Sequence, residues 1–121
     1  MKNKIIGLRP IIWIHDLNES MHFYTEILGF TVAEYNETWQ WASLYNGEIE
    51  LMLSKFNEHS LVKKATFTGS FYFNVLDVEA SWNSLKNKAK ICYEIESFDW
   101  RMREFAIYDT NGYILQFGQE I

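Results

Sequence analysis

Few side chains in this sequence are suited to covalent or metal chemistry, and they are scattered along it. Cys92 is the only cysteine, so the chain forms no internal disulfide and carries no cysteine-based zinc motif. The three histidines, His15, His22 and His59, fall on a predicted strand end, a predicted helix and a connecting segment. A structural or solvated role is commoner than metal ligation for isolated residues of this kind. No nucleophile with a partner base and no phosphate-binding loop is evident.

The chain is instead rich in aromatic side chains, with five Trp, seven Tyr and nine Phe among 121 residues. Large rings fill the core of a small domain, and they also line binding sites for flat ligands. The aromatic content alone therefore leaves two explanations open, core packing and ligand binding, and the positions of the rings have to decide between them.

Charge and length narrow the classes of partner. Eleven Lys and Arg stand against 16 Asp and Glu, which gives a net charge of -5. This balance argues against a nucleic-acid binder, which needs basic side chains to displace phosphate counterions, and mildly favours a cationic small ligand. No stretch approaches the roughly 18 apolar residues of a membrane span, and the apolar run within residues 1–10 is too short for the core of a secretory leader, so we expect neither. We expect a single soluble, cytoplasmic domain.

The first half of the chain predicts a β-α-β-β-β order. Asp16 stands at a helix N-cap position with Glu19 three residues later, and Gly29 ends the helix. Met21, Tyr24, Ile27 and Leu28 form its predicted apolar stripe. The predicted strands are 9–15, 30–35, 39–45 and 48–53, with Asn46-Gly47 as a hairpin turn between the last two.

The second half predicts the same order. Asp77 stands at the N-cap of a helix that ends near 86–88, and Asn111-Gly112 forms another hairpin turn. The predicted strands are 69–75, 91–95, 101–108 and 113–117. The repeated order of elements indicates two modules, about 5–56 and 68–121, within one domain covering residues 1–121.

Two β-α-β-β-β halves in one short chain resemble the vicinal oxygen chelate superfamily of glyoxalases, ring-cleaving dioxygenases, fosfomycin-resistance enzymes and bleomycin-resistance proteins. Residues 16–30 read like its first helix, with Asp-Leu, Ser, Phe-Tyr and Leu-Gly-Phe at the typical spacing. Residues 100–112 resemble the C-terminal signature of the bleomycin-resistance branch. Pro10 matches the proline of that branch that lets the N-terminal strand cross to a partner subunit.

This resemblance implies an α+β fold, in which two tandem βαβββ modules form a cupped mixed sheet with the helices outside. It also implies a homodimer. The fold hosts many chemistries, so the resemblance says more about fold than about function.

The resemblance further identifies the positions at which catalytic members bind a divalent metal. Here these positions hold Arg9, Glu50, Ser70 and Gln116. A guanidinium stays protonated and has no lone pair to donate, and a serine hydroxyl is a poor ligand for Zn, Ni or Mn. Glu50 is a good ligand and Gln116 a weak one, so the ligand set is broken in both modules. We predict no metal and no other cofactor at this site.

Strand alternation predicts which side chains surround the inward positions. Trp41 shares a face with Trp39 and Ser43, although alternation alone does not say whether that face is the inner one. Trp100 opens the strand that holds Arg103 and Glu104, which are also open to a surface or dimer-interface role as a pair. The candidate ligand-binding residues are Arg9, Trp13, Trp41, Glu50, Met52, Ser70, Tyr72, Trp100, Arg103 and Gln116.

Three function classes follow. The first is a metal-free protein resembling bleomycin-resistance proteins, which sequesters a planar, cationic molecule in an aromatic-lined cavity or dimer groove; antibiotic resistance is the role that this resemblance implies. The second is a metal-dependent glyoxalase-like lyase or isomerase, or a dioxygenase. The third is a metal-free enzyme that uses Glu50 as a base. Arg9 and Glu50 have a purely structural alternative, a buried ion pair across the former metal position. We favour the binding protein and expect no catalytic residue.

Overall fold

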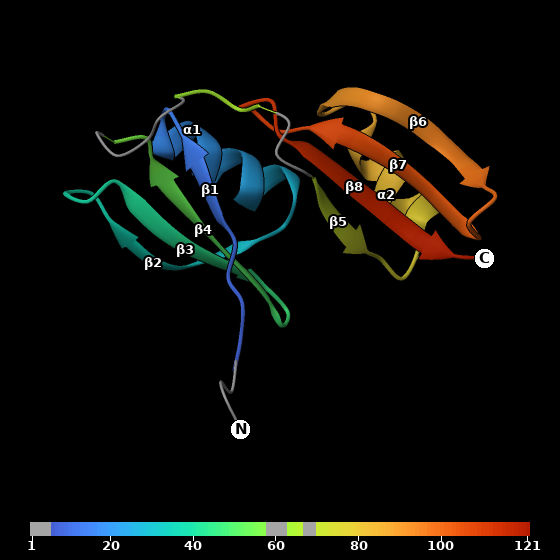
Figure 1. The fold of residues 1–121 in the computed structure, drawn as a ribbon, viewed down its shortest axis with the longest axis horizontal. Helices are drawn as coiled ribbons and strands as arrows, with labels where there is room; N and C mark the ends of the chain where they lie inside the picture. Colours follow the sequence, from blue (N-terminus) through green and yellow to red (C-terminus); the bar gives the residue numbers. More distant parts are fainter. Residues whose placement is uncertain (1–5, 58–62, 67–69) are drawn as a thin grey trace. The chain divides into compact units, whose positions relative to one another are not determined.

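The computed structural model describes residues 6–57, 63–66 and 70–121. The chain divides into two compact units, residues 1–61 (unit 1) and residues 62–121 (unit 2). Each unit follows the predicted β-α-β-β-β order and folds its strands into a four-stranded mixed sheet (Figure 1). The α+β class and the two tandem modules predicted from the sequence are thereby confirmed. None of the helices in the described part of the chain is long and apolar enough to span a membrane.

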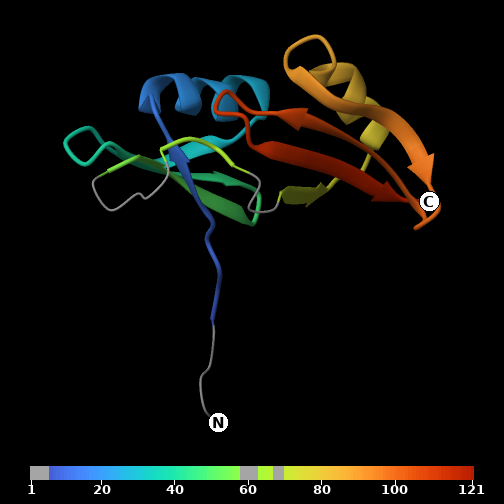
Figure 2. The ribbon, with the colours of Figure 1, turned by 45° about the horizontal axis from the view of Figure 1, so that its top comes forward.

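The sheet of unit 1 has the strand order β1-β4-β3-β2. β1 runs parallel to β4, and the other pairs are antiparallel. One face is covered by the helical segment, which lies behind β1 in Figure 1 and above the sheet in Figure 2. The elements are β1 (Ile11–Ile14), α1 (Leu17–His22), η1 (Phe23–Ile27), β2 (Thr31–Asn36), β3 (Trp41–Asn46) and β4 (Ile49–Lys55).

The helical segment of unit 1 begins as predicted but does not continue as one α-helix. The Asp16 carboxylate accepts a hydrogen bond from the Glu19 N–H at 3.0 Å, which confirms the N-cap. From Phe23 onward the helix widens into the π-helix η1. A π-helix closes its hydrogen bonds over five residues instead of four, so its turns are wider. The predicted stripe assumed 3.6 residues per turn, and that period ends here. Of that stripe only Tyr24 is fully buried, and Phe23 is buried beside it.

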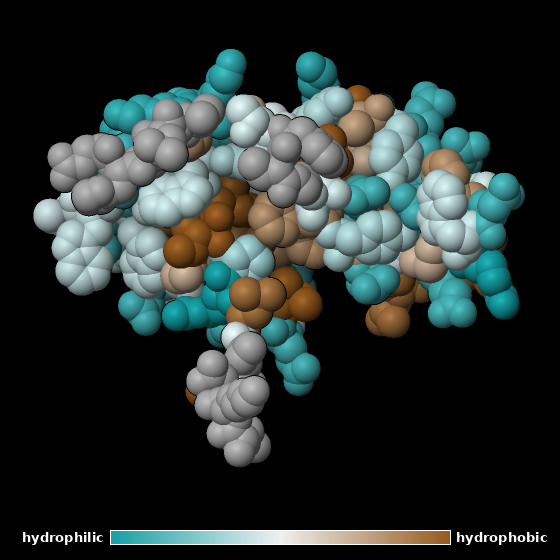
Figure 3. All heavy atoms as spheres, viewed as in Figure 1, coloured by the Kyte–Doolittle hydropathy of each residue, from teal (hydrophilic) through white to brown (hydrophobic). Residues whose placement is uncertain are grey.

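The two faces of the unit 1 sheet differ. Side chains such as Ile12 of β1 and Leu53 of β4 are fully buried beneath the helical segment. On the opposite face, Trp13 and Trp41 both lie next to Ser54 in the strand register. Trp41 therefore shares a face with Trp13, which settles what alternation alone left open. Figure 3 shows apolar surface along β1 and at the β3–β4 turn, where Ile49 is exposed.

The sheet of unit 2 has the strand order β5-β8-β7-β6, with β5 parallel to β8. β6 and β8 extend three residues beyond the C-terminal ends predicted from the sequence. The helix α2 lies behind β7 and β8 in Figure 1 and above them in Figure 2. The elements are β5 (Phe71–Asn74), α2 (Val78–Leu85), β6 (Lys90–Phe98), β7 (Met102–Tyr108) and β8 (Ile114–Glu120).

Aromatic rings fill the core between α2 and this sheet. Phe105 and Phe117 stack with their centroids 5.2 Å apart, and Trp82 of α2 packs edge-on against Phe105 at 5.2 Å. Phe73 lies 5.3 Å from Phe117. This part of the aromatic content is therefore core packing, on the helix side of the sheet.

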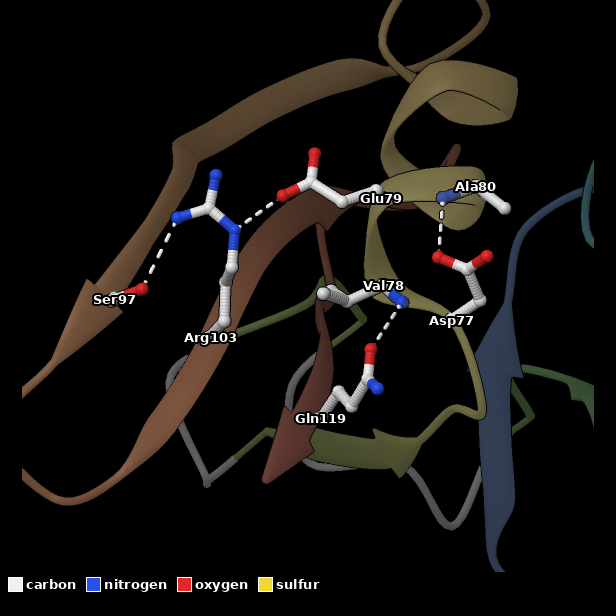
Figure 4. A network of polar contacts seen from close by, with 7 residues as sticks. All are labelled: Asp77, Val78, Glu79, Ala80, Ser97, Arg103 and Gln119. Atoms are coloured by element: carbon white, nitrogen blue, oxygen red, sulfur yellow. Dashed lines mark hydrogen bonds and ion pairs between the residues drawn. The ribbon is translucent and has the colours of Figure 1, made fainter. Parts of the chain in front are cut away.

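Polar contacts attach the first turn of α2 to the strands (Figure 4). The Asp77 carboxylate accepts from the Ala80 N–H at 3.1 Å, and the Val78 N–H donates to the Gln119 side chain at 2.9 Å. Arg103 forms an ion pair with Glu79 of α2 and donates to the Ser97 hydroxyl at 3.2 Å. These contacts fix the end of α2 at which the chain enters it from β5.

The position of Arg103 differs from the pairing suggested by the sequence. Arg103 and Glu104 are neighbours in β7, so strand alternation sends their side chains to opposite faces of the sheet. Arg103 turns to the helix side and pairs with Glu79 instead of Glu104. The interpretation of Arg103 and Glu104 as one surface pair was wrong, because it overlooked this alternation.

Candidate functional site

A buried carboxylate lies on the face of the unit 2 sheet that α2 does not cover. Glu104 of β7 is only 2% exposed. It accepts hydrogen bonds from the Tyr72 hydroxyl at 2.9 Å, from the Trp100 indole N–H at 2.8 Å and from the Tyr93 hydroxyl. A carboxylate taken out of water without partners is strongly destabilising, so these three donors are what make the burial of Glu104 possible.

A glycine allows Tyr72 to reach the carboxylate. β8 lies between β5, which carries Tyr72, and β7, which carries Glu104. Gly118 of β8 is directly opposite Glu104 in the register. A Cβ atom on Gly118 would stand 1.9 Å from the Tyr72 hydroxyl oxygen, which is a severe overlap. The phenol thus crosses β8 through the space that the missing side chain leaves.

Trp100 is held in place by the turn between β6 and β7. The backbone of Arg101 adopts a left-handed conformation with φ 67°, and its N–H donates to the Phe98 carbonyl at 3.1 Å. The indole of Trp100 stacks on the Phe98 ring at 4.5 Å with 10° between the planes, and Tyr93 packs edge-on against Phe98. Trp100 is nevertheless 61% exposed. The result is a solvent-exposed indole in a fixed orientation.

Two further side chains continue the polar contacts away from the carboxylate. The Gln116 amide donates to the Tyr93 hydroxyl oxygen at 2.9 Å, and the Ser70 hydroxyl donates to the Gln116 carbonyl oxygen. We call the connected set the Glu104 cluster. Its members are Ser70, Tyr72, Tyr93, Trp100, Glu104 and Gln116.

The environment fixes the protonation states within the cluster. Burial raises the pKa of the Glu104 carboxyl, but the hydrogen bonds from Tyr93, Trp100, Tyr72 and Gln116 outweigh it and leave that pKa below its ordinary value. Burial, together with the hydrogen bond to Glu104 and its charge, raises the pKa of Tyr72 to about 12. The pKa of Tyr93 is raised as well, with burial as the largest cause. At neutral pH the carboxylate is ionised and both phenols keep their protons.

The cluster brings together four residues predicted from the sequence: Ser70, Tyr72, Trp100 and Gln116. In unit 1, Trp13, Trp41 and Met52 lie on one sheet face, while Arg9 and Glu50 are exposed. The ion pair between Arg9 and Glu50, which the sequence left open as a structural alternative, is not formed, although both residues are described. Arg103 lies on the helix side of unit 2. A ligand contact at any of these residues stays a prediction.

The residues present do not fit a resident metal at the positions implied by the resemblance. Ser70 and Gln116 are hydrogen-bonded to each other, and Arg9 has no lone pair to offer. Within residues 6–57, 63–66 and 70–121, no three His, Cys, Asp or Glu side chains gather in a way that could hold a metal ion. His59 lies outside the described residues.

Sequence reasoning missed Glu104 and Tyr93 as site residues. The run Phe105-Ala106-Ile107 indicated a strand buried on both faces, and a carboxylate beside such a run needs hydrogen-bond donors. Gly118, a glycine inside a strand, was a second signal, because it often marks the close approach of another group. The two signals point to the same place only once the register of β7 and β8 is known.

The internal repeat shows that the cluster is specific to unit 2. Trp39 and Gln40 precede β3 as Trp100 and Arg101 precede β7, and Gln40 also has a left-handed backbone, with φ 52°. Counted in the same way, Ser43 of β3 corresponds to Glu104 of β7. Unit 1 thus repeats the tryptophan and its turn without the carboxylate.

Residues 8–117 match the family described as the Glyoxalase/Bleomycin resistance protein/Dioxygenase superfamily. The chain belongs to this superfamily. The match confirms the superfamily that the sequence resembles, and it spans both units. Comparison with the curated proteins gave no match.

Solved structures share the superfamily fold at low sequence identity. A protein of unknown function from Agrobacterium tumefaciens str. C58 is 20% identical, with a TM-score of 0.81 over 98% of this chain and 97% of its own. TioX from Micromonospora sp. ML1 is 17% identical, with a TM-score of 0.73 over 95% and 100%. A glyoxalase/bleomycin resistance protein/dioxygenase from Nocardioides is 15% identical, with a TM-score of 0.72 over 99% and 87%. At these identities the likeness concerns the fold alone.

The ionised state of Glu104 makes a testable contribution to stability. Because its pKa in the folded chain lies below the ordinary 4.5, the contribution is present above pH 4.5 and is lost as the pH falls through the folded value. We expect the free energy of unfolding of the parent protein to decline more steeply below pH 4.5 than that of Glu104→Gln. Urea unfolding between pH 3 and 7 measures both, and parallel curves would contradict the assignment.

Gly118→Ala tests the passage of Tyr72 across β8. The added methyl group would displace the phenol and remove its hydrogen bond to Glu104, so we expect a loss of about 1–3 kcal/mol in the free energy of unfolding. In the double variant Tyr72→Ala/Gly118→Ala the added methyl group meets no ring. The Gly118→Ala step should therefore cost less in that background, as measured by urea unfolding. An equal cost in both backgrounds would show that the glycine serves another purpose.

Proposed function

We propose that the chain binds a small planar, cationic molecule on the uncovered face of unit 2 and does not transform it. The observation that carries this proposal is the indole of Trp100, which is exposed to solvent yet oriented by its stacking on Phe98 and its hydrogen bond to Glu104. A ring held in one orientation loses little conformational freedom when a flat ligand stacks on it.

The charge beneath the rings favours a cation. Glu104 is ionised, and it lies under Tyr72, Tyr93 and Trp100, whose hydrogen bonds all end on its carboxylate. The faces of aromatic rings attract cations by themselves, and a fixed negative charge behind them adds to that attraction. The net charge of -5 acts in the same direction at longer range.

The same features argue against proton-transfer catalysis in this cluster. The Glu104 carboxylate already accepts three hydrogen bonds, and its lowered pKa makes it a weak base. Glu50, the base of the alternative hypothesis, is exposed on β4, so its surroundings do not shelter it from water. The metal-dependent alternative would need good metal ligands where Arg9, which has no lone pair to offer, and Ser70, a poor ligand, stand. More specifically, we propose that the chain binds its ligand in the manner of the bleomycin-resistance branch, and that it confers antibiotic resistance in the cytoplasm.

Substituting Trp100 tests the proposed site. With proflavine as a planar cationic probe, we expect Trp100→Ala to lower the affinity about tenfold, because stacking on one aromatic ring contributes about 1–3 kcal/mol. Trp100→Phe should retain part of the affinity for proflavine. Trp39→Ala is the matched control, since Trp39 occupies the corresponding turn of unit 1 and is 72% exposed. Calorimetric titration measures all four proteins, and equal losses at Trp39 and Trp100, or none at Trp100, would reject the site.

We further propose that the chain is a homodimer, on the resemblance of Pro10 to the proline of the bleomycin-resistance branch. Pro10 comes directly before β1, which is an edge strand of its sheet. An edge strand offers unpaired backbone groups to another chain. Sedimentation equilibrium at micromolar concentration should give about twice the mass of 14.4 kDa. A single species at the monomer mass would contradict the dimer.

A further inference from the structure

We infer that Glu104 orients every hydrogen bond of its cluster inward, so that the surface left to a ligand accepts hydrogen bonds and selects planar cations with N–H donors, such as aromatic amidines. Planar carboxylates of the same shape are rejected. This inference rests on the proposed function and names the class of ligand that the site takes.

The direction of each hydrogen bond follows from the carboxylate. An ionised carboxylate only accepts, so the hydroxyls of Tyr72 and Tyr93 and the indole of Trp100 must each donate their single hydrogen to it. The Tyr93 oxygen then has only lone pairs to offer, so Gln116 must turn its NH₂ group toward it. That places the Gln116 carbonyl oxygen against Ser70, whose hydroxyl must donate to it. Because each hydrogen bond follows from the one before it, the orientation of the Gln116 amide is determined.

The hydrogen-bond donors that a ligand would otherwise meet are therefore already engaged in hydrogen bonds within the cluster. The hydroxyl hydrogens of Ser70 and Tyr72 point away from solvent, but both residues are exposed and their oxygens keep lone pairs. The only N–H of Trp100 is committed to Glu104. The Gln116 amide donates to the Tyr93 oxygen and also contributes to the lowered pKa of Glu104, so it too is engaged within the cluster. The exposed surface of the cluster consists mainly of acceptors.

Two further carboxylates lie on the face of Glu104. Glu96 of β6 is opposite Glu104 in the register, and Glu120 of β8 is opposite Met102, so both exposed carboxylates share the face of Glu104. Lys90 on this face is at the far end of β6, where its ammonium group lies 5.3 Å from the centre of the Tyr108 ring. Arg101, an exposed cation, stands in the turn that carries Trp100, while the acceptors of the cluster and the carboxylates of Glu96 and Glu120 oppose a ligand carboxylate.

A pair of probes with the same shape tests the inference. Naphthalene-2-carboxamidine donates hydrogen bonds and is cationic, whereas naphthalene-2-carboxylate accepts them and is anionic. Calorimetric titration should show the amidine binding the parent protein at least about tenfold more tightly, as expected for a charge-assisted hydrogen bond. Proflavine, measured alongside, reports on the proposed function itself.

Variants separate hydrogen-bond direction from overall charge. Glu104→Gln introduces donors into the cluster and should reduce the preference for the amidine about tenfold. Glu120→Gln removes one negative charge from the same face without touching the cluster, and should reduce the preference far less. Should Glu104→Gln fail to fold, Ser70→Ala removes an exposed acceptor and should weaken amidine binding several-fold, with Asn74→Ala on the same face as its control.

The possible outcomes distinguish the two claims. Proflavine binding without a preference for the amidine, or with neither naphthalene probe bound, would overturn the inference and leave the proposed function standing. Equal effects of Glu104→Gln and Glu120→Gln would show that net charge alone selects the ligand. Equal effects of Ser70→Ala and Asn74→Ala would show that the Ser70 acceptor takes no part in the selection. Either result would also overturn the inference. Failure of proflavine and both naphthalene probes to bind would overturn the proposed function together with the inference.

Discussion

Burying a charged carboxylate on a sheet face constrains everything around it. Glu104 keeps its charge because three donors converge on it from β5, from β6 and from the turn that follows β6. Each donor in turn depends on a local feature of the backbone. Tyr72 needs the absent side chain of Gly118, and Trp100 needs the left-handed turn at Arg101. The cluster is thus a property of the whole unit 2 sheet and not of any one strand.

The two units show how a repeated scaffold supports a site in only one copy. Both have an Asp N-cap and a tryptophan in the turn before the third strand of the unit, so these features belong to the shared fold. Unit 1 has Ser43 where unit 2 has Glu104, and a serine does not draw donors from three elements at once. The difference between the two units at this position therefore comes down to one charged side chain and the residues that hydrogen-bond to it.

The sequence was sufficient to predict features that depend on local patterns. Element order and both N-caps rest on neighbouring residues, and four members of the cluster follow from alternation combined with the family resemblance. Asn46 pairs with Ile49, so the turn after β3 lies one residue later than predicted, at Gly47 and Glu48. Features that depend on the register between strands could not be predicted from the sequence. Glu104 and Tyr93 meet only because β6, β7 and β8 pair as they do, and the π-helix at Phe23 changes a period that the sequence pattern assumes constant. The pairing of Arg103 with Glu79 also joins two elements, and the sequence pattern does not reveal such a contact.

The protonation states of the cluster bear on both parts of the proposed function, ligand binding and the absence of proton transfer. A site that moves protons near neutral pH needs groups whose pKa values lie close to that pH. Here hydrogen bonds lower the pKa of Glu104, while burial, together with the hydrogen bond to Glu104 and its charge, raises the pKa of Tyr72 and of Tyr93, so all three lie away from neutrality. These shifts stabilise one arrangement of hydrogens, with every donor turned toward the carboxylate. The fixed arrangement gives the exposed surface a constant pattern of acceptors, which suits selective binding of a donor ligand and opposes proton transfer to it.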